Sequence, residues 1–130
     1  MAALSNYLEN ELLDHVLKVG SYTAPTQILI ALFTAGTGLE ASTLTDEVTG
    51  GAYARTTATM AAAAAGTSTN SADVTFPTAT AAWGTVTHCA LMENAAGTNV
   101  LFHGTLGASK IVGSDDVFKF NTGDFQCALD

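Results

Sequence analysis

The sequence predicts a mainly β protein: an antiparallel β-sandwich of the jelly-roll-like kind, with one amphipathic helix at the N-terminus. Apolar residues recur with the period of a helix only near the start of the chain. The remainder consists of short stretches rich in Val, Thr, Ile and Phe, separated by turn-forming Gly, Asn, Asp and Ser. One helix followed by about seven or eight such strands is expected to pack as two layers, with the helix on their side or end.

The N-terminal helix is predicted over about residues 6–19. Asn6 is placed to cap its first turn, and Glu9 completes a capping box. Lys18 lies in the predicted last turn, where a cation is favourable, and Gly20 lies just after the predicted helix end, where glycine is common. The apolar stripe of this helix consists of Leu8, Leu12, Leu13, Val16, Leu17 and Val19.

Residues 26–34 are apolar on both faces, which predicts a central strand covered on both sides. The N-terminal helix is the candidate cover for one side. The polar residues 35–51 then predict a long loop, of a length that usually has a function or makes contacts.

The remaining strands are expected to be short. Alternation over 52–60 favours a strand, and we expect it to continue through the alanines at 61–65, which have helix propensity but no cap. Further strands are expected at 72–76, 83–93, 98–106 and 109–113, with a hairpin turn at 94–97, and a last hairpin joins 116–121 to 124–129. No repeat or linker interrupts the chain, so we expect a single domain over residues 1–130, with the sandwich spanning about 26–129.

The charge of the chain disfavours several classes of partner. The formal net charge is −8, and the four basic residues form no cluster that could neutralise phosphates: Lys18, Arg55, Lys110 and Lys119. We therefore expect no binding to nucleic acid or to anionic membranes. No segment has the length and apolar character of a transmembrane helix, and the acidic N-terminus is unlike a signal peptide.

The cysteines and histidines do not predict a metal site. Cys89 and Cys127 lack CxxC spacing, and we expect two reduced, buried thiols. His88 and His103 lie on consecutive predicted strands and could face each other, which would supply at most two ligands. Zinc sites use at least three protein ligands, so we expect no metal, no other cofactor, and folding that is insensitive to chelators.

No residue pattern predicts catalysis. A nucleophilic site needs an activated side chain with a base in reach, and the chain has no GxSxG elbow. Asp115 and Asp116 lie in a predicted turn, where carboxylates usually bond to the backbone. We therefore expect no catalytic residues and no enzymatic activity.

Three residues are candidates for subunit contacts. Tyr53 and Arg55 occupy alternate positions of one predicted strand and therefore share a face. Arginine is enriched at interfaces because its planar guanidinium binds carboxylates bidentately, although an arginine on a solvated sheet face fits the same pattern. Trp83 begins another predicted strand. It either anchors the core or an end of the sandwich, or it lies in a subunit interface.

Several blocks of the chain form a specific ordered set: LSNYLENELLDHVL, ILIALFTA, EVTGGAYAR, NSADVTFPTATAAWGTVTHCALME, NVLFHGTL and GDFQCALD. In this order they resemble a family of small structural proteins of tailed bacteriophages, whose members are often called tail fibre or virion structural proteins. The resemblance covers nearly the whole chain. It implies a virion component and supplies no catalytic residue.

Two places in a virion then remain open. The favoured one is a capsid decoration or cement protein on the outer surface of the capsid, bound to the major capsid protein, because the chain is small and lacks fibrous repeats. The alternative is a tail component, such as a fibre-base or tail-tip protein, bound to other tail proteins. We expect a homo-oligomer, with a trimer favoured, because symmetric lattice sites favour matching oligomers.

Overall fold

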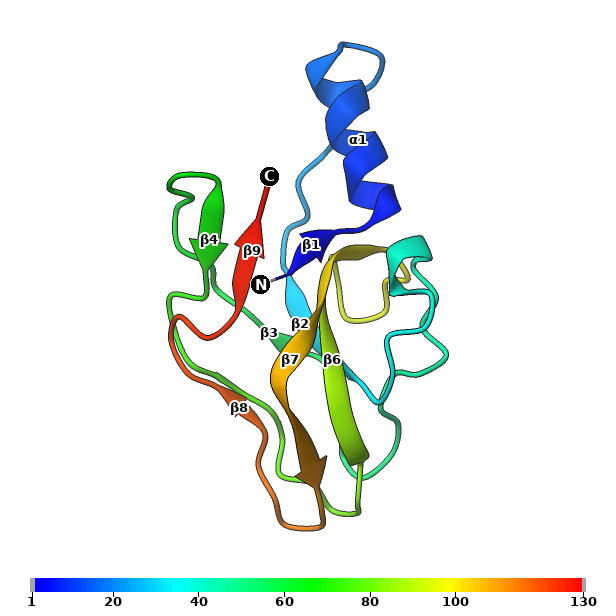
Figure 1. Cartoon of the computed structure of the whole chain (residues 1–130), viewed down its shortest axis with the longest axis vertical. Coiled ribbons are helices and arrows are strands. Elements are labelled where there is room, and N and C mark those ends of the chain that lie inside the picture. Colours follow the sequence, from blue (N-terminus) through cyan, green and yellow to red (C-terminus); the bar gives the residue numbers. More distant parts are fainter. Residues whose placement is uncertain (1, 130) are drawn as a thin grey trace.

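A five-stranded antiparallel sheet forms the larger layer of the structure (Figure 1). The computed structural model describes residues 2–129. The strand order is β1-β7-β6-β2-β3. The strands are β1 (Ala3–Leu4), β2 (Leu29–Phe33), β3 (Thr56–Thr57), β6 (Gly84–Met92) and β7 (Val100–Val112). The two long strands, β6 and β7, are consecutive in the chain and form the hairpin on which the sheet is built.

The opposite layer consists of two short antiparallel pairs. The strands β4 (Thr67–Thr69) and β9 (Gln126–Ala128) form one pair, and β5 (Val74–Thr75) and β8 (Lys119–Phe120) form the other. The chain is therefore mainly β, with an antiparallel sandwich-like fold and one N-terminal helix, which confirms the predicted fold class.

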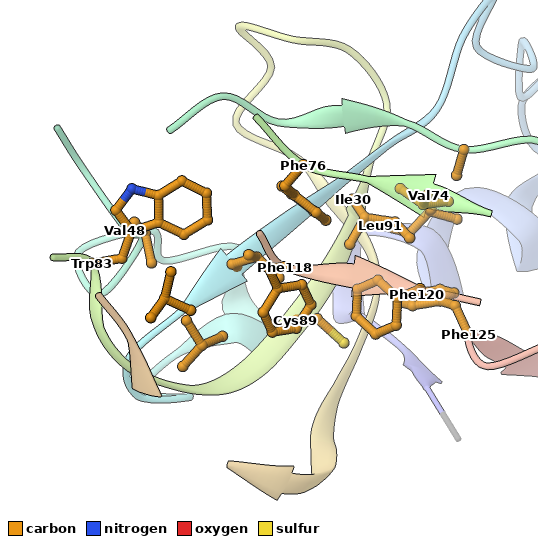
Figure 2. Close-up of a cluster of buried hydrophobic side chains, with 14 of the residues drawn as sticks. Ile30, Val48, Val74, Phe76, Trp83, Cys89, Leu91, Phe118, Phe120 and Phe125 are labelled. Carbon is orange, nitrogen blue, oxygen red and sulfur yellow. The ribbon is translucent and has the colours of Figure 1, made fainter. Parts of the chain in front are cut away.

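The main hydrophobic core lies between these layers (Figure 2). Alternate residues of β2, such as Ile30 and Leu32, face it from the large sheet. Trp83 lies toward one end of the cluster, and Phe120 and Phe125 lie toward the other. Aromatic edge-to-face contacts run through the opposite layer, with ring centroids 5.2 Å apart for Phe118 and Phe120 and 5.7 Å apart for Phe120 and Phe125.

The other face of the large sheet is covered by the loop after β2, not by the helix. Ala31 and Phe33 of β2 pack there with Leu39, which lies in a 3-10 turn, η1 (Leu39–Ala41). Every residue of β2 is buried, so the prediction of a strand covered on both sides is confirmed. The prediction that the helix covers the second side of this strand was wrong, because the long loop predicted over 35–51 folds back onto this face.

The helix α1 (Asn6–Val16) is shorter than predicted, and its cap is Ser5, not Asn6. The Ser5 hydroxyl accepts a hydrogen bond from the Leu8 N–H at 3.3 Å, so Glu9 is not at the capping-box position. The helix ends at Val16, and Lys18, not Gly20, adopts the left-handed conformation just beyond it, with φ 61°. Within residues 2–129, no helix has the length and apolar character to cross a membrane.

Other strand predictions were wrong in pairing or extent. Residues 61–65 form no continuous strand, and only Thr56–Thr57 of the strand predicted over 52–60 joins the sheet. The strands expected at 98–106 and 109–113 are one strand, β7. The last two strands, β8 and β9, pair with β5 and β4 and not with each other.

Candidate functional site

The block at residues 47–55 folds around a partly buried ion pair, which we call the Glu47–Arg55 clasp. Arg55 Nε donates to Glu47 Oε1 and Nη2 donates to Glu47 Oε2, both at 2.8 Å. Arg55 Nη1 donates to the carbonyl oxygens of Gly97, at 2.7 Å, and Asn94, at 3.3 Å. The two charged side chains are only 10 % and 15 % exposed. One guanidinium thus ties the loop after β2 to the turn between β6 and β7.

Tyr53 extends the clasp into the core. Its hydroxyl donates to Glu47 Oε1 at 3.0 Å and accepts from the N–H of Leu32, in β2, at 2.9 Å. Its ring meets Trp83 edge to face, with centroids 5.4 Å apart, and stacks on Phe76. Burial raises the pKa of Tyr53 well above its usual range, and the hydrogen bonds to Glu47 raise the pKa of Arg55. At neutral pH the tyrosine is therefore neutral and the arginine charged.

Trp83 anchors the core beside a glycine turn. Its Nε1–H donates to the Gly51 carbonyl oxygen at 2.9 Å, and that oxygen also accepts from the Thr80 N–H at 3.0 Å. Gly51 has φ 56°, and a Cβ atom there would lie 2.7 Å from the carbonyl oxygen of Ala81. This close approach requires glycine at position 51.

The structure therefore brings the three candidate contact residues together, but by contacts within the chain. Trp83 is a core anchor, as one of its two interpretations predicted. Contacts of Tyr53, Arg55 and Trp83 with another subunit remain a prediction. Sequence reasoning missed Glu47, which lies in the irregular loop before Tyr53 and Arg55.

The predicted histidine pair is not directly opposed. His88 pairs with Thr105 across the β6–β7 hairpin, and His103 pairs with Ala90. His103 Nε2 lies 2.8 Å from Glu40 Oε2. Among the residues that the structure describes, no three His, Cys, Asp or Glu side chains form a possible metal site.

Both cysteines are free thiols and buried, as predicted. Burial raises the pKa of Cys89 and of Cys127 to about 12. The thiolate is the reactive form, so neither residue has the lowered pKa of a nucleophilic cysteine.

We expect these thiols to react with Ellman's reagent more than ~100-fold slower in the folded protein at pH 8 than after unfolding in guanidinium. The raised pKa of the two thiols also makes the free energy of unfolding fall as the pH rises. The contribution of these buried, protonated thiols to stability is complete below the unfolded thiol pKa of ~8.5, and it is lost progressively between that pH and the folded pKa of about 12. Labelling that is equally fast in native buffer would contradict the buried placement.

Residues 3–128 match a protein family described as podophage GP4 fiber I protein gp80. A search of curated proteins found no match. The family match spans almost all of the described residues, including the clasp, the core strands and the helix. The chain therefore belongs to the podophage GP4 fiber I protein gp80 family and is a structural protein of a bacteriophage virion.

Proposed function

We propose that this protein is a non-enzymatic component of the phage tail fibre apparatus. The observation that carries the proposal is the match of residues 3–128 to a family described as a fiber protein. It supports the tail alternative over the capsid decoration role that the sequence favoured. The chain has no fibrous repeat, so we place it at the base or attachment point of a fibre and not in a shaft.

The physical character of the chain supports an assembly role. Its charged content of 12 % leaves few groups for recognition by salt bridges, so shape and apolar contact carry its specificity. The clasp links the loop after β2 to the β6–β7 turn on one surface of the molecule. We infer that its partners are other tail proteins and further copies of itself, in a trimer, because a symmetric attachment site gives each copy an equivalent neighbour.

The position in the virion is tested by separating heads and tails of disrupted particles and probing both with an antibody against this protein. We expect the signal with the tails, in far fewer copies than the major capsid protein. Particles that lack the protein should keep intact, heat-resistant heads and lose adsorption to the host. Signal on the heads in near-lattice copy number, with normal tails, would instead establish capsid decoration.

A further inference from the structure

One edge of the large sheet is left open along most of β7. The strand β1 pairs with β7 only at Phe102 and His103. Among residues 2–129, no other strand pairs with β7 on that side, and residues 104–111 make no backbone hydrogen bond outside the strand ladders. We call residues 104–111 the β7 edge. An open edge of this kind offers a row of backbone N–H and C=O groups with which another strand can pair.

The opposite side of the same sheet is closed by the chain itself. Beyond the short β3, the Leu32 N–H of β2 donates to the Tyr53 hydroxyl at 2.9 Å, and the Leu32 carbonyl oxygen accepts from the Val48 N–H at 3.0 Å. Just before β2, the Ile28 carbonyl oxygen accepts from the Ala58 N–H at 2.9 Å. Hydrogen bonds within the chain therefore protect this side of the sheet, whereas the β7 edge needs another form of protection.

The composition of the β7 edge makes pairing with other strands a hazard. In β7, whose sequence is VLFHGTLGASKIV, only Lys110 carries a full charge at neutral pH. Residues 107–111 are all exposed, and Ile111 is 81 % exposed. Exposed edge strands with apolar residues and little charge are the usual sites at which β proteins associate wrongly.

Lys110 lies on the core-facing side of the sheet. It pairs with Val86, and residues directly opposite each other in an antiparallel pair share a face. Val86 is fully buried in the main core, to which Val112, two residues after Lys110, also belongs. Lys110 is nevertheless exposed, because it lies beside a hollow of about 440 Å³ between β7 and the opposite layer, which Phe118 also lines. A strand added to the β7 edge would enclose its ammonium group between the two layers.

The neighbouring charges do not compensate Lys110. Its ammonium group forms no ion pair among residues 2–129. Asp116 lines the same hollow, but its Oδ2 accepts from the Gly113 N–H at 2.7 Å, and Lys119, which also lines the hollow, pairs with Asp73 at 2.9 Å. Enclosing the Lys110 ammonium would therefore cost the free energy of removing an unpaired charge from water.

A β-bulge disrupts the same edge. Val86 pairs with Lys110 and His88 pairs with Thr105, so residues 106–109 of β7 lie opposite Thr87 alone. A bulge increases the local twist of a strand and breaks the regular spacing of its backbone groups. A new strand would find that spacing interrupted in the middle of the β7 edge.

We propose that Lys110 and the adjacent bulge protect the β7 edge, so that copies of this protein do not join their large sheets edge to edge. Lysines, charges that point inward and bulges are the devices by which natural β proteins protect open edges, and all three coincide on this edge. The inference goes beyond the proposed function and holds wherever the protein lies in the virion. It also implies that the trimer proposed above forms through another surface.

Replacing Lys110 with valine is expected to strengthen self-association about tenfold or more at matched protein concentration, because a residue that favours strands replaces the charge that opposes pairing. Lys110→Arg keeps the charge and is the matched control, which should associate as the wild type does. Lys110→Ala should fall between them, since alanine removes the charge but adds little apolar surface. Sedimentation measures the association, and circular dichroism establishes that each variant is folded.

Hydrogen exchange locates the new contact. In the wild type, the amides of the β7 edge that point away from β6 should exchange without protection in any oligomer that forms. In Lys110→Val, the same amides should become protected at concentrations where the variant associates.

Three results would overturn the proposal. The first is a valine variant that associates no more strongly than Lys110→Arg, and the second is an associated valine variant whose edge amides stay unprotected. The third is protection of these amides in a wild-type oligomer, which would make the β7 edge a subunit interface. The location of the protein is measured separately in particles, so none of these results bears on the proposed place in the tail.

Discussion

Replacing Asn70 with aspartate is expected to lower the free energy of unfolding by about 3 kcal/mol or more at neutral pH. Asn70 is completely buried. Its Nδ2 donates to the carbonyl oxygens of Ala72, at 2.8 Å, and Asn121, at 2.9 Å, while its Oδ1 accepts from the Phe125 N–H at 2.8 Å. A carboxylate keeps the last bond, but it replaces the Nδ2 amino group, which makes both donations, with a negative oxygen that faces two carbonyl oxygens.

The loss should depend on pH in a defined direction. Burial and the two facing carbonyls disfavour the charged form, so the introduced carboxyl would have a folded pKa above its unfolded value of ~3.9. The destabilisation should be smallest below about pH 4 and should grow as the pH rises through the folded pKa. Urea unfolding at pH 4 and pH 7 measures both limits.

The control for this variant is Asn10→Asp, which makes the same chemical change at an exposed position of α1. We expect it to change stability by less than ~0.5 kcal/mol at either pH. If Asn70→Asp at pH 7 were as stable as this control, the buried hydrogen bonds of Asn70 would not contribute as described.

The two longest predicted core strands could be placed from the sequence, whereas the partners of the shortest strands could not. Residues 26–34 contain β2, because a stretch that is apolar on both faces has few other ways to be buried, and residues 83–93 contain β6. The strands β8 and β9 are too short to specify a partner by their own pattern. Their pairing depends on the aromatic core, which joins residues far apart in the chain.

Asn70 illustrates a second limit of prediction from sequence, the burial of a polar side chain. In the sequence it belongs to a polar Thr- and Ser-rich turn, where an asparagine is usually solvated. Its burial arises because Phe125 and Asn121 close over it from the other end of the chain. Similarly, the periodicity of α1 identified an apolar stripe, but periodicity does not specify what covers a stripe, and in this structure most of it faces solvent.

The candidate contact residues were found, but their partners were not. Alternation placed Tyr53 and Arg55 on one face of a predicted strand. In the structure neither residue lies in a strand, but both side chains contact the same carboxylate. The carboxylate belongs to Glu47, whose position depends on how a long irregular loop returns along the edge of β2. Spacing within such a loop carries no periodic signal, so the ion pair could not be derived from it.

Replacing Arg55 with alanine is expected to lower the free energy of unfolding by about 3 kcal/mol. The change leaves the half-buried Glu47 carboxylate without its cationic partner and the Gly97 carbonyl oxygen without its donor at 2.7 Å. Arg55→Lys should cost roughly half as much, since it keeps the charge but loses the two parallel bonds to Glu47. Lys110→Ala removes an exposed cation and serves as the control. A double-mutant cycle with Glu47→Gln isolates the energy of the pair.

The same variants separate an internal clasp from a subunit contact at Arg55. If the guanidinium acts only within the chain, the losses measured on the isolated protein should account for any loss of heat resistance in particles carrying the variant. Within residues 2–129, Glu47, Gly97 and Asn94 leave one Nη2 N–H of Arg55 free. If that N–H binds a neighbouring subunit, Arg55→Lys should weaken association more than it weakens folding, because lysine keeps the charge but loses this directed donor. Full stability of Arg55→Ala in urea would contradict the clasp, because the partly buried Glu47 carboxylate would then need no cation beside it.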